Sequence, residues 1–130
     1  MKNNLTTTIT SGKFKGKKLS LPSLSTTRST KSIVKESVFN SLQGEIYGSV
    51  FIELFGGSGL MAATAVSNYA KKGYAIELDR AAFNSLRENF RRLSDDGNES
   101  SVALQGETFE LTPKILAQNI EQKTILYADP

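Results

Sequence analysis

The sequence contains no cysteine, no histidine and no tryptophan. Without cysteine it has no thiol nucleophile and no disulfide framework, and without histidine it has neither a Ser-His-Asp triad nor the usual zinc ligand sets. No apolar run reaches the roughly 18 residues of a membrane span, and the start, Met1-Lys-Asn-Asn-Leu-Thr-Thr-Thr8, lacks the apolar core of a signal peptide. We therefore expect a cytoplasmic protein with no membrane contact and no metal site.

Basic residues are concentrated at the front of the chain. Residues 1–40 hold eight basic side chains and one acid, a net charge of +7, whereas residues 41–130 hold eight basic and twelve acidic groups, a net charge of −4. A basic front on a mildly acidic body suggests that only the front contacts a polyanion. The alternative is a solvated lysine-rich hairpin. The length, 130 residues, allows one domain at most, large enough for a real core.

The first forty residues predict an arm, a linker and a helix. Gly12 and Gly16 mark turns in Ile9–Leu19, which is expected to form a small β-hairpin or hairpin-like arm. Phe14 is expected to tuck under this arm rather than stack on a nucleic-acid base. Leu21–Thr30, rich in Ser and Thr, is typical of a linker. A helix capped by Thr30 or Ser32 then runs to about Leu42, with Val34, Val38 and Leu42 on one stripe.

After residue 50, apolar strands alternate with helical patterns. The expected strands are Val50–Phe55, Gly73–Glu77, Val102–Leu104 and Thr124–Ala128. The expected helices are Leu60–Ala70, one capped by Asp79 with Phe83, Leu86, Phe90 and Leu93 on its apolar face, and one opened by Thr112-Pro113 with Ile115, Leu116 and Ile120 inward. The arginines of the helix behind Asp79 (Arg80, Arg87, Arg91, Arg92) are interpreted as a solvated face, with nucleic-acid contact as the alternative. This alternation predicts an open parallel α/β sheet.

The turn between the first strand and its helix is a candidate cofactor site. Gly56, Gly57 and Gly59 follow the strand, and side chains at these positions would fill the space that a cofactor needs. Glu77 ends the next strand about 20 residues later, where an acidic residue reaches ribose hydroxyls in such folds. The sequence thus predicts a nucleoside-containing cofactor at this turn.

Two cofactor classes use a turn of this kind. Gly57-Ser-Gly59-Leu-Met-Ala62 fits a relaxed dinucleotide pattern. The other candidate is S-adenosylmethionine, which has no phosphate. Glu53 favours it, because a carboxylate there can serve the cofactor's ammonium group or the amides of the turn but would lie unfavourably near a pyrophosphate. A purely structural, amide-bonded Glu53 is the alternative.

Asp129-Pro130 follows the last expected strand and supports methyl transfer to a base. An exocyclic amine is a poor nucleophile, because its lone pair is delocalised into the ring. An acceptor must hold it in line with the methyl group at about 3 Å. A carboxylate at a strand end, followed by a proline that fixes the backbone, can do this.

Together these patches resemble the RsmD-type bacterial methyltransferases, which act on the 2-amino group of a guanine in small-subunit ribosomal RNA. The likeness rests on four stretches: Ile9-x-x-Gly12-x-x-x-Gly16-x-x-Leu19, Arg28-Ser-Thr30-x-x-x-Val34-Lys-Glu36-x-Val38-Phe39-Asn40, Glu53-Leu-Phe-Gly-Gly-Ser-Gly59 with Glu77-x-Asp79, and Asp129-Pro130. Ser29 and Lys35 depart mildly from the family pattern, and Gln105-Gly106-Glu107 occupies the place of its adenine-binding Asp or Asn.

The resemblance implies a Rossmann-like class I methyltransferase sheet and a set of site residues. Catalysis is expected from Asp129 and Pro130. S-adenosylmethionine is expected to contact Glu53, Phe55, Gly56, Gly57, Ser58, Gly59, Glu77, Leu78 and Glu107. RNA is expected to contact Lys13, Lys15, Lys17, Lys18, Arg28 and Lys31. Residues 1–28 would form the arm and linker and 29–130 the methyltransferase domain, expected to be incomplete because the family's second proline, its aromatic residue and the last strands do not follow.

The leading hypothesis is therefore an S-adenosylmethionine-dependent guanine methyltransferase acting on small-subunit ribosomal RNA. It is expected to be a monomer, and whether it requires RNA assembled with ribosomal proteins stays open. One alternative is an RNA-binding module that keeps the cofactor fold without turnover. The other is an NAD-dependent oxidoreductase, which lacks an assignable histidine or tyrosine-lysine pair.

Overall fold

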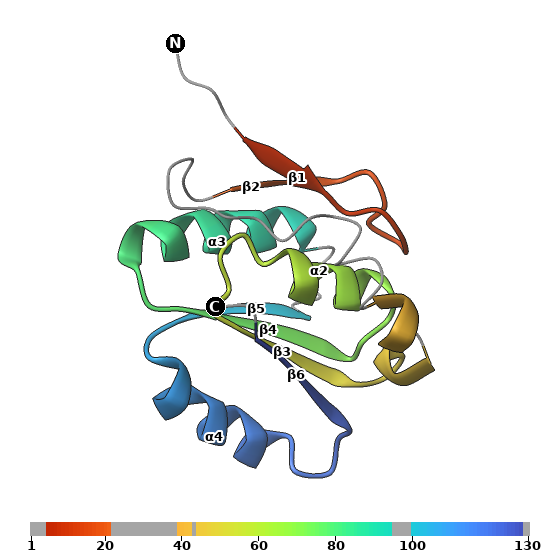
Figure 1. Cartoon of the computed structure of the whole chain (residues 1–130), viewed down its shortest axis with the longest axis vertical. Coiled ribbons are helices and arrows are strands. Elements are labelled where there is room, and N and C mark those ends of the chain that lie inside the picture. The colour runs from red at the N-terminus through yellow and green to blue at the C-terminus, as the bar shows by residue number, and fades with distance from the viewer. Residues whose placement is uncertain (1–4, 22–38, 43, 95–99, 129–130) are drawn as a thin grey trace.

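A parallel sheet of four strands forms the centre of the computed structural model, which describes residues 5–21, 39–42, 44–94 and 100–128. The strands are β3 (Val50–Leu54), β4 (Lys72–Glu77), β5 (Ser101–Gln105) and β6 (Thr124–Ala128). They lie in the order β5-β4-β3-β6, and every neighbouring pair is parallel (Figure 1). The expected parallel α/β sheet is confirmed, with each strand end within one residue of its predicted position.

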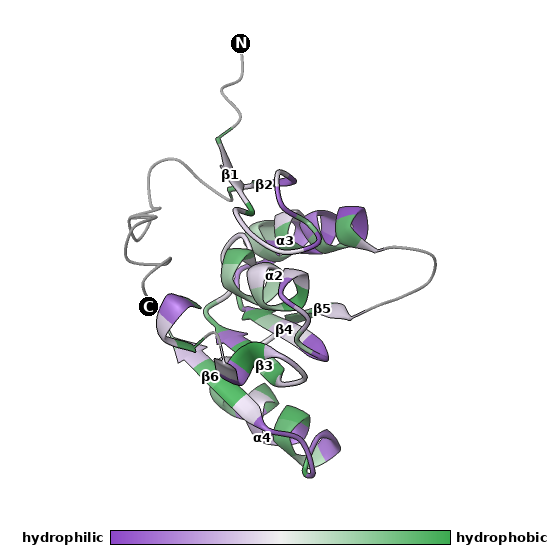
Figure 2. Ribbon diagram, turned by 90° about the vertical axis from the view of Figure 1, so that its right-hand side faces the viewer, coloured by the Kyte–Doolittle hydropathy of each residue, from purple (hydrophilic) through white to green (hydrophobic). Residues whose placement is uncertain are grey.

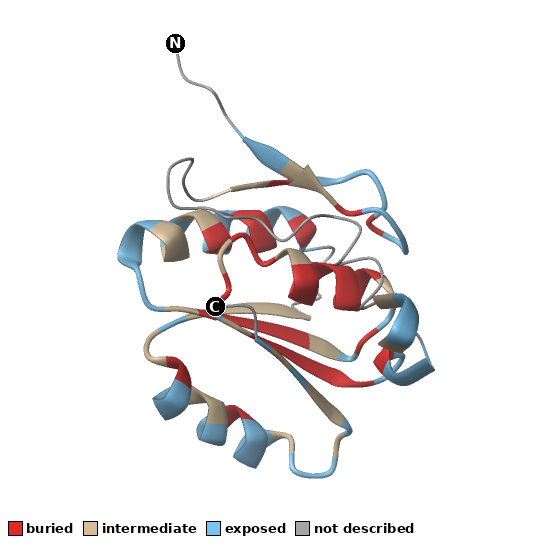
Figure 3. Ribbon diagram, viewed as in Figure 1, coloured by how far each residue is buried: buried red, intermediate tan, exposed pale blue. Residues whose placement is uncertain are grey.

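Helices cover both faces of this sheet. On one face lie α2 (Leu60–Ser67) and α3 (Arg80–Leu93), and α4 (Thr108–Gln118) lies on the other (Figure 1). Because side chains alternate along a strand, Phe51 packs with the cluster under α2 and α3, whereas Ile52 packs with Ile115 of α4. The central strands β3 and β4 are accordingly the most buried (Figure 3). No helix in the described part of the chain is both long and apolar enough to cross a membrane.

The predicted hairpin is present and packs above α2 and α3 (Figure 1). Its antiparallel strands are β1 (Thr6–Thr8), which ends just before the expected range Ile9–Leu19, and β2 (Lys18–Ser20), which begins inside that range and ends one residue beyond it. Ile9, Phe14 and Leu19 are buried in the same cluster as Phe51. Phe14 is only 9% exposed. The expectation that it tucks under the arm is therefore confirmed, and it is not available to stack on a base.

Ser67, the last residue of α2, anchors the loop between the two hairpin strands. The amides of Lys13 and Phe14 donate to the Ser67 carbonyl and Oγ, each at 2.8 Å, and Ser67 Oγ donates to the Ser11 carbonyl at 2.6 Å. Gly12, at φ +85°, lies so close to the Ser67 carbonyl that a Cβ would overlap it. Glycine is therefore required at this contact.

The helix predicted behind Asp79 is confirmed. Asp79 Oδ2 accepts a hydrogen bond from the Ala82 amide at 2.8 Å, so it caps α3 as expected. Leu86, Phe90 and Leu93 are buried, and hydrophilic residues alternate with hydrophobic ones along the helix (Figure 2). This is the amphipathic pattern that the spacing predicted.

The helix predicted to open at Thr112-Pro113 begins earlier, so that prediction was wrong. α4 starts at Thr108, and Glu107 is its cap, because Glu107 Oε1 accepts from the Glu110 amide at 2.9 Å. Pro113 lies inside the helix. The Thr112 hydroxyl donates to the Thr108 carbonyl at 2.7 Å, so this residue serves the helix interior rather than its cap.

The inward face of α4 also differs from the prediction. Ile115 is buried, but Leu116 is 38% exposed and Ile120, beyond the end of the helix, is 83% exposed. Thr108 and Ile115, the buried residues of α4, are seven positions apart and so share one face of the helix, whereas Leu116 lies about 100° round from Ile115.

Several expectations for residues 21–46 fall outside the described residues. Residues 39–42 and 44–46 are helical, which agrees with a helix reaching about Leu42. Its two candidate caps, the stripe residues Val34 and Val38 and the linker beyond Leu21 are not among the described residues. The division of the chain near residue 28 stays a prediction.

Candidate cofactor site

The turn at residues 56–59 lies at the carboxyl end of β3, next to the end of β4. The Gly56 amide donates to the Ile76 carbonyl of β4 at 2.7 Å, and the Gly59 amide donates to the Gly56 carbonyl at 2.8 Å. Helix α2 begins at the next residue, Leu60. The predicted order of strand, glycine turn and helix is therefore present at the edge where parallel α/β sheets bind ligands.

The three glycines of this turn differ in what a side chain at each position would meet. A Cβ on Gly57, at φ +55°, would meet no atom within 4 Å, so the space above it is open. A Cβ on Gly59, at φ +82°, would lie 2.5 Å from Leu86 Cδ1 and 2.6 Å from Phe90 Cε1. The expectation that all three glycines keep space free for a cofactor is thus corrected for Gly59, where α3 already fills that space. At Gly56 a Cβ would lie 3.1 Å from Ala75 Cβ and 3.2 Å from the Ile76 carbonyl oxygen, so β4 crowds this position and the expectation is corrected there too.

Glu77 connects the glycine turn with the start of α3. One carboxylate oxygen accepts from the Gly57 amide and the other from the Asp79 amide, both at 3.0 Å. The carboxylate therefore lies against the glycine turn. Its contact with ribose hydroxyls stays a prediction. Each oxygen retains a further acceptor position for a hydroxyl donor.

Glu53 is buried beneath the turn and is 6% exposed. Its Oε1 accepts from the Ala62 amide at 2.9 Å, in the first turn of α2, where the helix dipole favours an anion. Glu53 is therefore amide-bonded, which both interpretations of this residue allow. A contact with the cofactor's ammonium group stays a prediction.

Phe55 and Leu78 are exposed apolar residues that follow the ends of β3 and β4 beside the turn. Phe55 has φ +59°, a left-handed conformation that is unfavourable for an aromatic residue. Such conformations cluster at functional sites but are not confined to them, since Tyr69, away from the turn, has φ +73°. Ser58 is buried, and its Oγ accepts from the Leu60 amide at 3.3 Å.

Glu107 follows β5 at the same edge of the sheet, two residues beyond Gln105, which pairs with Glu77. Since its carboxylate caps α4, the residue already has a structural role. The adenine contact expected from the resemblance stays a prediction.

The expected RNA contacts are partly described. Lys13, Lys15, Lys17 and Lys18 are exposed on the hairpin. Lys13 Nζ lies 5.3 Å from the centre of the Phe14 ring and 5.6 Å from that of Tyr69, within cation–π range. Arg28, Lys31 and the catalytic candidates Asp129 and Pro130 lie outside the described residues. Ala128, directly before Asp129, pairs with Leu54 at the carboxyl end of β3.

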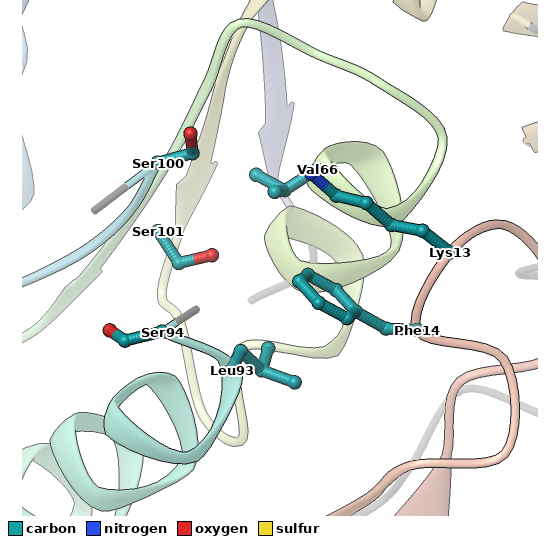
Figure 4. A pocket seen from close by; sticks show the side chains of 7 residues that line it. All are labelled: Lys13, Phe14, Val66, Leu93, Ser94, Ser100 and Ser101. Carbon is teal, nitrogen blue, oxygen red and sulfur yellow. The ribbon is translucent and has the colours of Figure 1, made fainter. Parts of the chain in front are cut away.

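Two hollows lie away from the glycine turn. One, of about 60 Å³, lies between the hairpin loop, the end of α3 and the start of β5 (Figure 4). Its lining consists of Lys13, Phe14, Val66, Leu93, Ser94, Ser100 and Ser101. The other, of about 380 Å³, lies along α3 and β5 and includes Arg87 and Arg91. The first is at the amino end of the strands, opposite the turn, so it does not belong to the candidate cofactor site.

Asn89 is a residue that the sequence reasoning missed. It is fully buried on α3 and its side chain donates to the Ser58 carbonyl of the turn at 2.9 Å. The available signal was a polar residue at position 89 inside the apolar stripe of Leu86, Phe90 and Leu93.

The parallel sheet, the glycine turn and the acid at the end of the neighbouring strand define a Rossmann-like methyltransferase fold, and solved structures share it. A putative methyltransferase, yhhF, from Escherichia coli is 29% identical with a TM-score of 0.70, over 82% of this chain and 56% of that one. A putative methylase, HI0767, from Haemophilus influenzae matches in fold, with a TM-score of 0.62 at 22% identity over 95% of this chain and 80% of that one.

The chain belongs to the family described as Conserved hypothetical protein 95, the RsmD-type family, whose sequence model matches residues 7–130. The ribosomal RNA small subunit methyltransferase D of Escherichia coli K12 is 33% identical over 122 residues, which are 94% of this chain and 58% of that protein. The Haemophilus influenzae protein of the same name is 31% identical over 94% of this chain and 62% of its own length. The chain thus spans about three fifths of the length of these relatives.

Proposed function

We propose that the turn at residues 56–59 binds S-adenosylmethionine and that the protein methylates small-subunit ribosomal RNA. The observation that carries the proposal is the hydrogen bond between the Gly57 amide and Glu77, with open space above Gly57. Bare backbone beside a carboxylate suits a nucleoside, because the carboxylate accepts from ribose hydroxyls and the absent side chain permits close approach. The residues present therefore fit this cofactor.

Glu53 favours S-adenosylmethionine over a dinucleotide. In a dinucleotide site the pyrophosphate lies on the amides at the start of the helix. Here the Glu53 carboxylate already accepts the Ala62 amide at 2.9 Å. A pyrophosphate at this turn would therefore find the Ala62 amide already occupied and lie near a buried carboxylate, whereas a cofactor with a positive charge and no phosphate meets neither cost.

The proposed reaction transfers a methyl group to the exocyclic 2-amino group of a guanine. When bound, S-adenosylmethionine supplies an electrophilic methyl group on a sulfonium. Asp129 would accept a hydrogen bond from the amine and hold its nitrogen in line with that methyl group, while Pro130 fixes the backbone at this position. The amine nitrogen would form a bond to the methyl carbon as the sulfur–methyl bond breaks, which leaves a neutral thioether, and the surplus proton of the amine would pass to solvent water. The target base must leave its stack to reach the site.

The family match and the names of the relatives support ribosomal RNA as the substrate. The hairpin supports an RNA substrate physically, since a stretch of six of its residues, 13–18, carries four exposed lysines. Lys13, Lys15, Lys17 and Lys18 would contact phosphates, together with Arg28 and Lys31. Such contacts make the affinity fall as the salt concentration rises.

Two measurements test this function. Isothermal titration should show binding of S-adenosylmethionine and none of NAD, and binding of NAD alone would exclude the proposed cofactor. A methyl-transfer assay on small-subunit RNA should then give activity that Asp129→Ala abolishes. Cofactor binding with no transfer would support the RNA-binding module, and equal transfer by both forms would remove Asp129 from catalysis.

A further inference from the structure

Asn89 of α3 uses its whole side-chain amide in hydrogen bonds inside the protein. The residue is 0% exposed. Its Nδ2 donates to the carbonyls of Ser20 and Ser58, both at 2.9 Å. Its Oδ1 accepts from the Ser20 amide at 2.8 Å and from Arg92 Nη2 at 2.6 Å. Two donors and two acceptor positions are thus all satisfied.

On one side, Asn89 binds the hairpin in the way a neighbouring strand would. Ser20 is the last residue of β2, and the side-chain amide pairs with both its N–H and its C=O. Arg92, one turn further along α3, adds a weak contact of 3.4 Å to Ser20 Oγ. The basic hairpin is therefore fixed to α3 through a buried polar contact at the end of its second strand.

On the other side, Asn89 binds the cofactor turn. The Ser58 carbonyl that it contacts lies between Gly57, whose amide donates to Glu77, and Gly59, which packs against Leu86 and Phe90. The same face of α3 thus determines the path of the turn and the position of the hairpin. A single side chain joins the two.

We propose that Asn89 is a positioning residue that couples the basic hairpin to the cofactor turn, so that RNA on the hairpin and S-adenosylmethionine at the turn strengthen each other's binding. This inference rests on the proposed function. The physical basis is that either ligand restricts one end of the contact, which lowers the ordering entropy left for the other. Linkage requires the same factor in both directions. We expect a factor of at least about five.

Ser67 offers a matched control. It also holds the hairpin through a buried hydrogen bond from the Phe14 amide and a partly buried one to the Ser11 carbonyl, but it belongs to α2 and does not contact the cofactor turn. Asn89→Ala and Ser67→Ala therefore each remove one polar attachment of the hairpin. Only the first also removes a contact to Ser58.

The first experiment uses the unmodified protein. The affinity for S-adenosylmethionine is measured with and without a small-subunit RNA fragment, and the affinity for RNA is measured with and without the cofactor. Both ratios should be equal and at least about five. Ratios of one would overturn the coupling while leaving the proposed function intact. Absence of any S-adenosylmethionine binding would overturn the proposed function, and this inference with it.

The second experiment assigns the coupling to Asn89 by amide hydrogen exchange. The reporters are the amides of Ile9 and Gly16, which donate to the Lys17 and Ile9 carbonyls inside the hairpin and belong to peptide groups that do not contact Asn89. Adding S-adenosylmethionine should slow their exchange in the wild type and in Ser67→Ala, but not in Asn89→Ala. Slowing that persists in Asn89→Ala, or that is abolished equally in both variants, would show that Asn89 has only a structural role.

Discussion

Replacing Gly59 by alanine should cost stability, whereas replacing Gly57 should cost cofactor affinity. At Gly59 the new methyl group would lie 2.5 Å from Leu86 Cδ1 and 2.6 Å from Phe90 Cε1. Both side chains are buried, so they have little room to move. Overpacking of this kind costs about 1–3 kcal/mol, and a left-handed alanine adds about 1–2 kcal/mol. The expected loss of unfolding free energy is therefore about 2–5 kcal/mol.

Gly57→Ala is the control within the same turn. Its φ of +55° imposes the same left-handed cost of about 1–2 kcal/mol, but no atom lies within 4 Å of the new methyl group. At about 4 °C per kcal/mol for a domain of this size, the melting temperature should fall by about 8–20 °C for Gly59→Ala and about 4–8 °C for Gly57→Ala. The affinity for S-adenosylmethionine should fall at least about tenfold in Gly57→Ala, because its methyl group enters the proposed cofactor space.

The melting temperatures are measured by circular dichroism during thermal unfolding. The cofactor affinities are measured by calorimetric titration at a temperature where both variants are folded. Equal melting temperatures for the two variants would refute the packing argument for Gly59. A larger loss of affinity in Gly59→Ala than in Gly57→Ala would show that the cofactor lies over Gly59 instead.

Three further predictions concern charged groups. Glu77→Ala removes the acceptor of two backbone amides, so calorimetry should show at least about a tenfold loss of S-adenosylmethionine affinity, with an unfolding free energy lower by about 1.5–3 kcal/mol. Lys15→Ala should reduce the slope of log affinity for RNA against log salt concentration by about 0.7–0.9, because one lysine that neutralises one phosphate contributes a slope of this size. The melting temperature should not change. Lys114→Ala on α4 should change neither quantity. The hydrogen bond and positive charge of Lys123 lower the pKa of Glu45, so the pair stabilises the fold above the ordinary glutamate pKa and loses this effect as the pH falls through the lowered value. The melting temperature of Lys123→Ala should therefore be slightly lower than that of the wild type near neutral pH. If the two melting temperatures still differed below the folded pKa of Glu45, this account would be contradicted.

The elements that the sequence predicted well are those with a clear hydrophobic periodicity and with clear cap or glycine residues at their ends. The strand after Gly48 is a short apolar run closed by glycines, and α3 has an acidic cap followed by apolar residues at helical spacing. Local physics determines both. The start of α4 was missed because Thr112-Pro113 is a typical helix opening, while Glu107, which caps the helix, also carried a possible cofactor role.

The sequence predicted which residues form the candidate site better than it predicted why each residue type is needed there. A glycine can serve a ligand, a turn or a neighbouring helix, and the sequence alone does not separate these. Gly59 is determined by Leu86 and Phe90, about thirty residues away, and Asn89 by partners on the hairpin and the turn. Such long-range contacts leave no periodic pattern in the chain.

Burial of Ile9, Phe14 and Leu19 in the main core has a thermodynamic consequence for the basic arm. The arm loses most of its conformational freedom when the protein folds, so only its residual motion is left to be restricted when a polyanion binds. Its lysine backbones are held at fixed spacing, and only their side chains remain to be ordered. The arm thus presents its lysines as an array of charges at fixed backbone spacing, which favours a phosphate backbone of matching curvature over an arbitrary one.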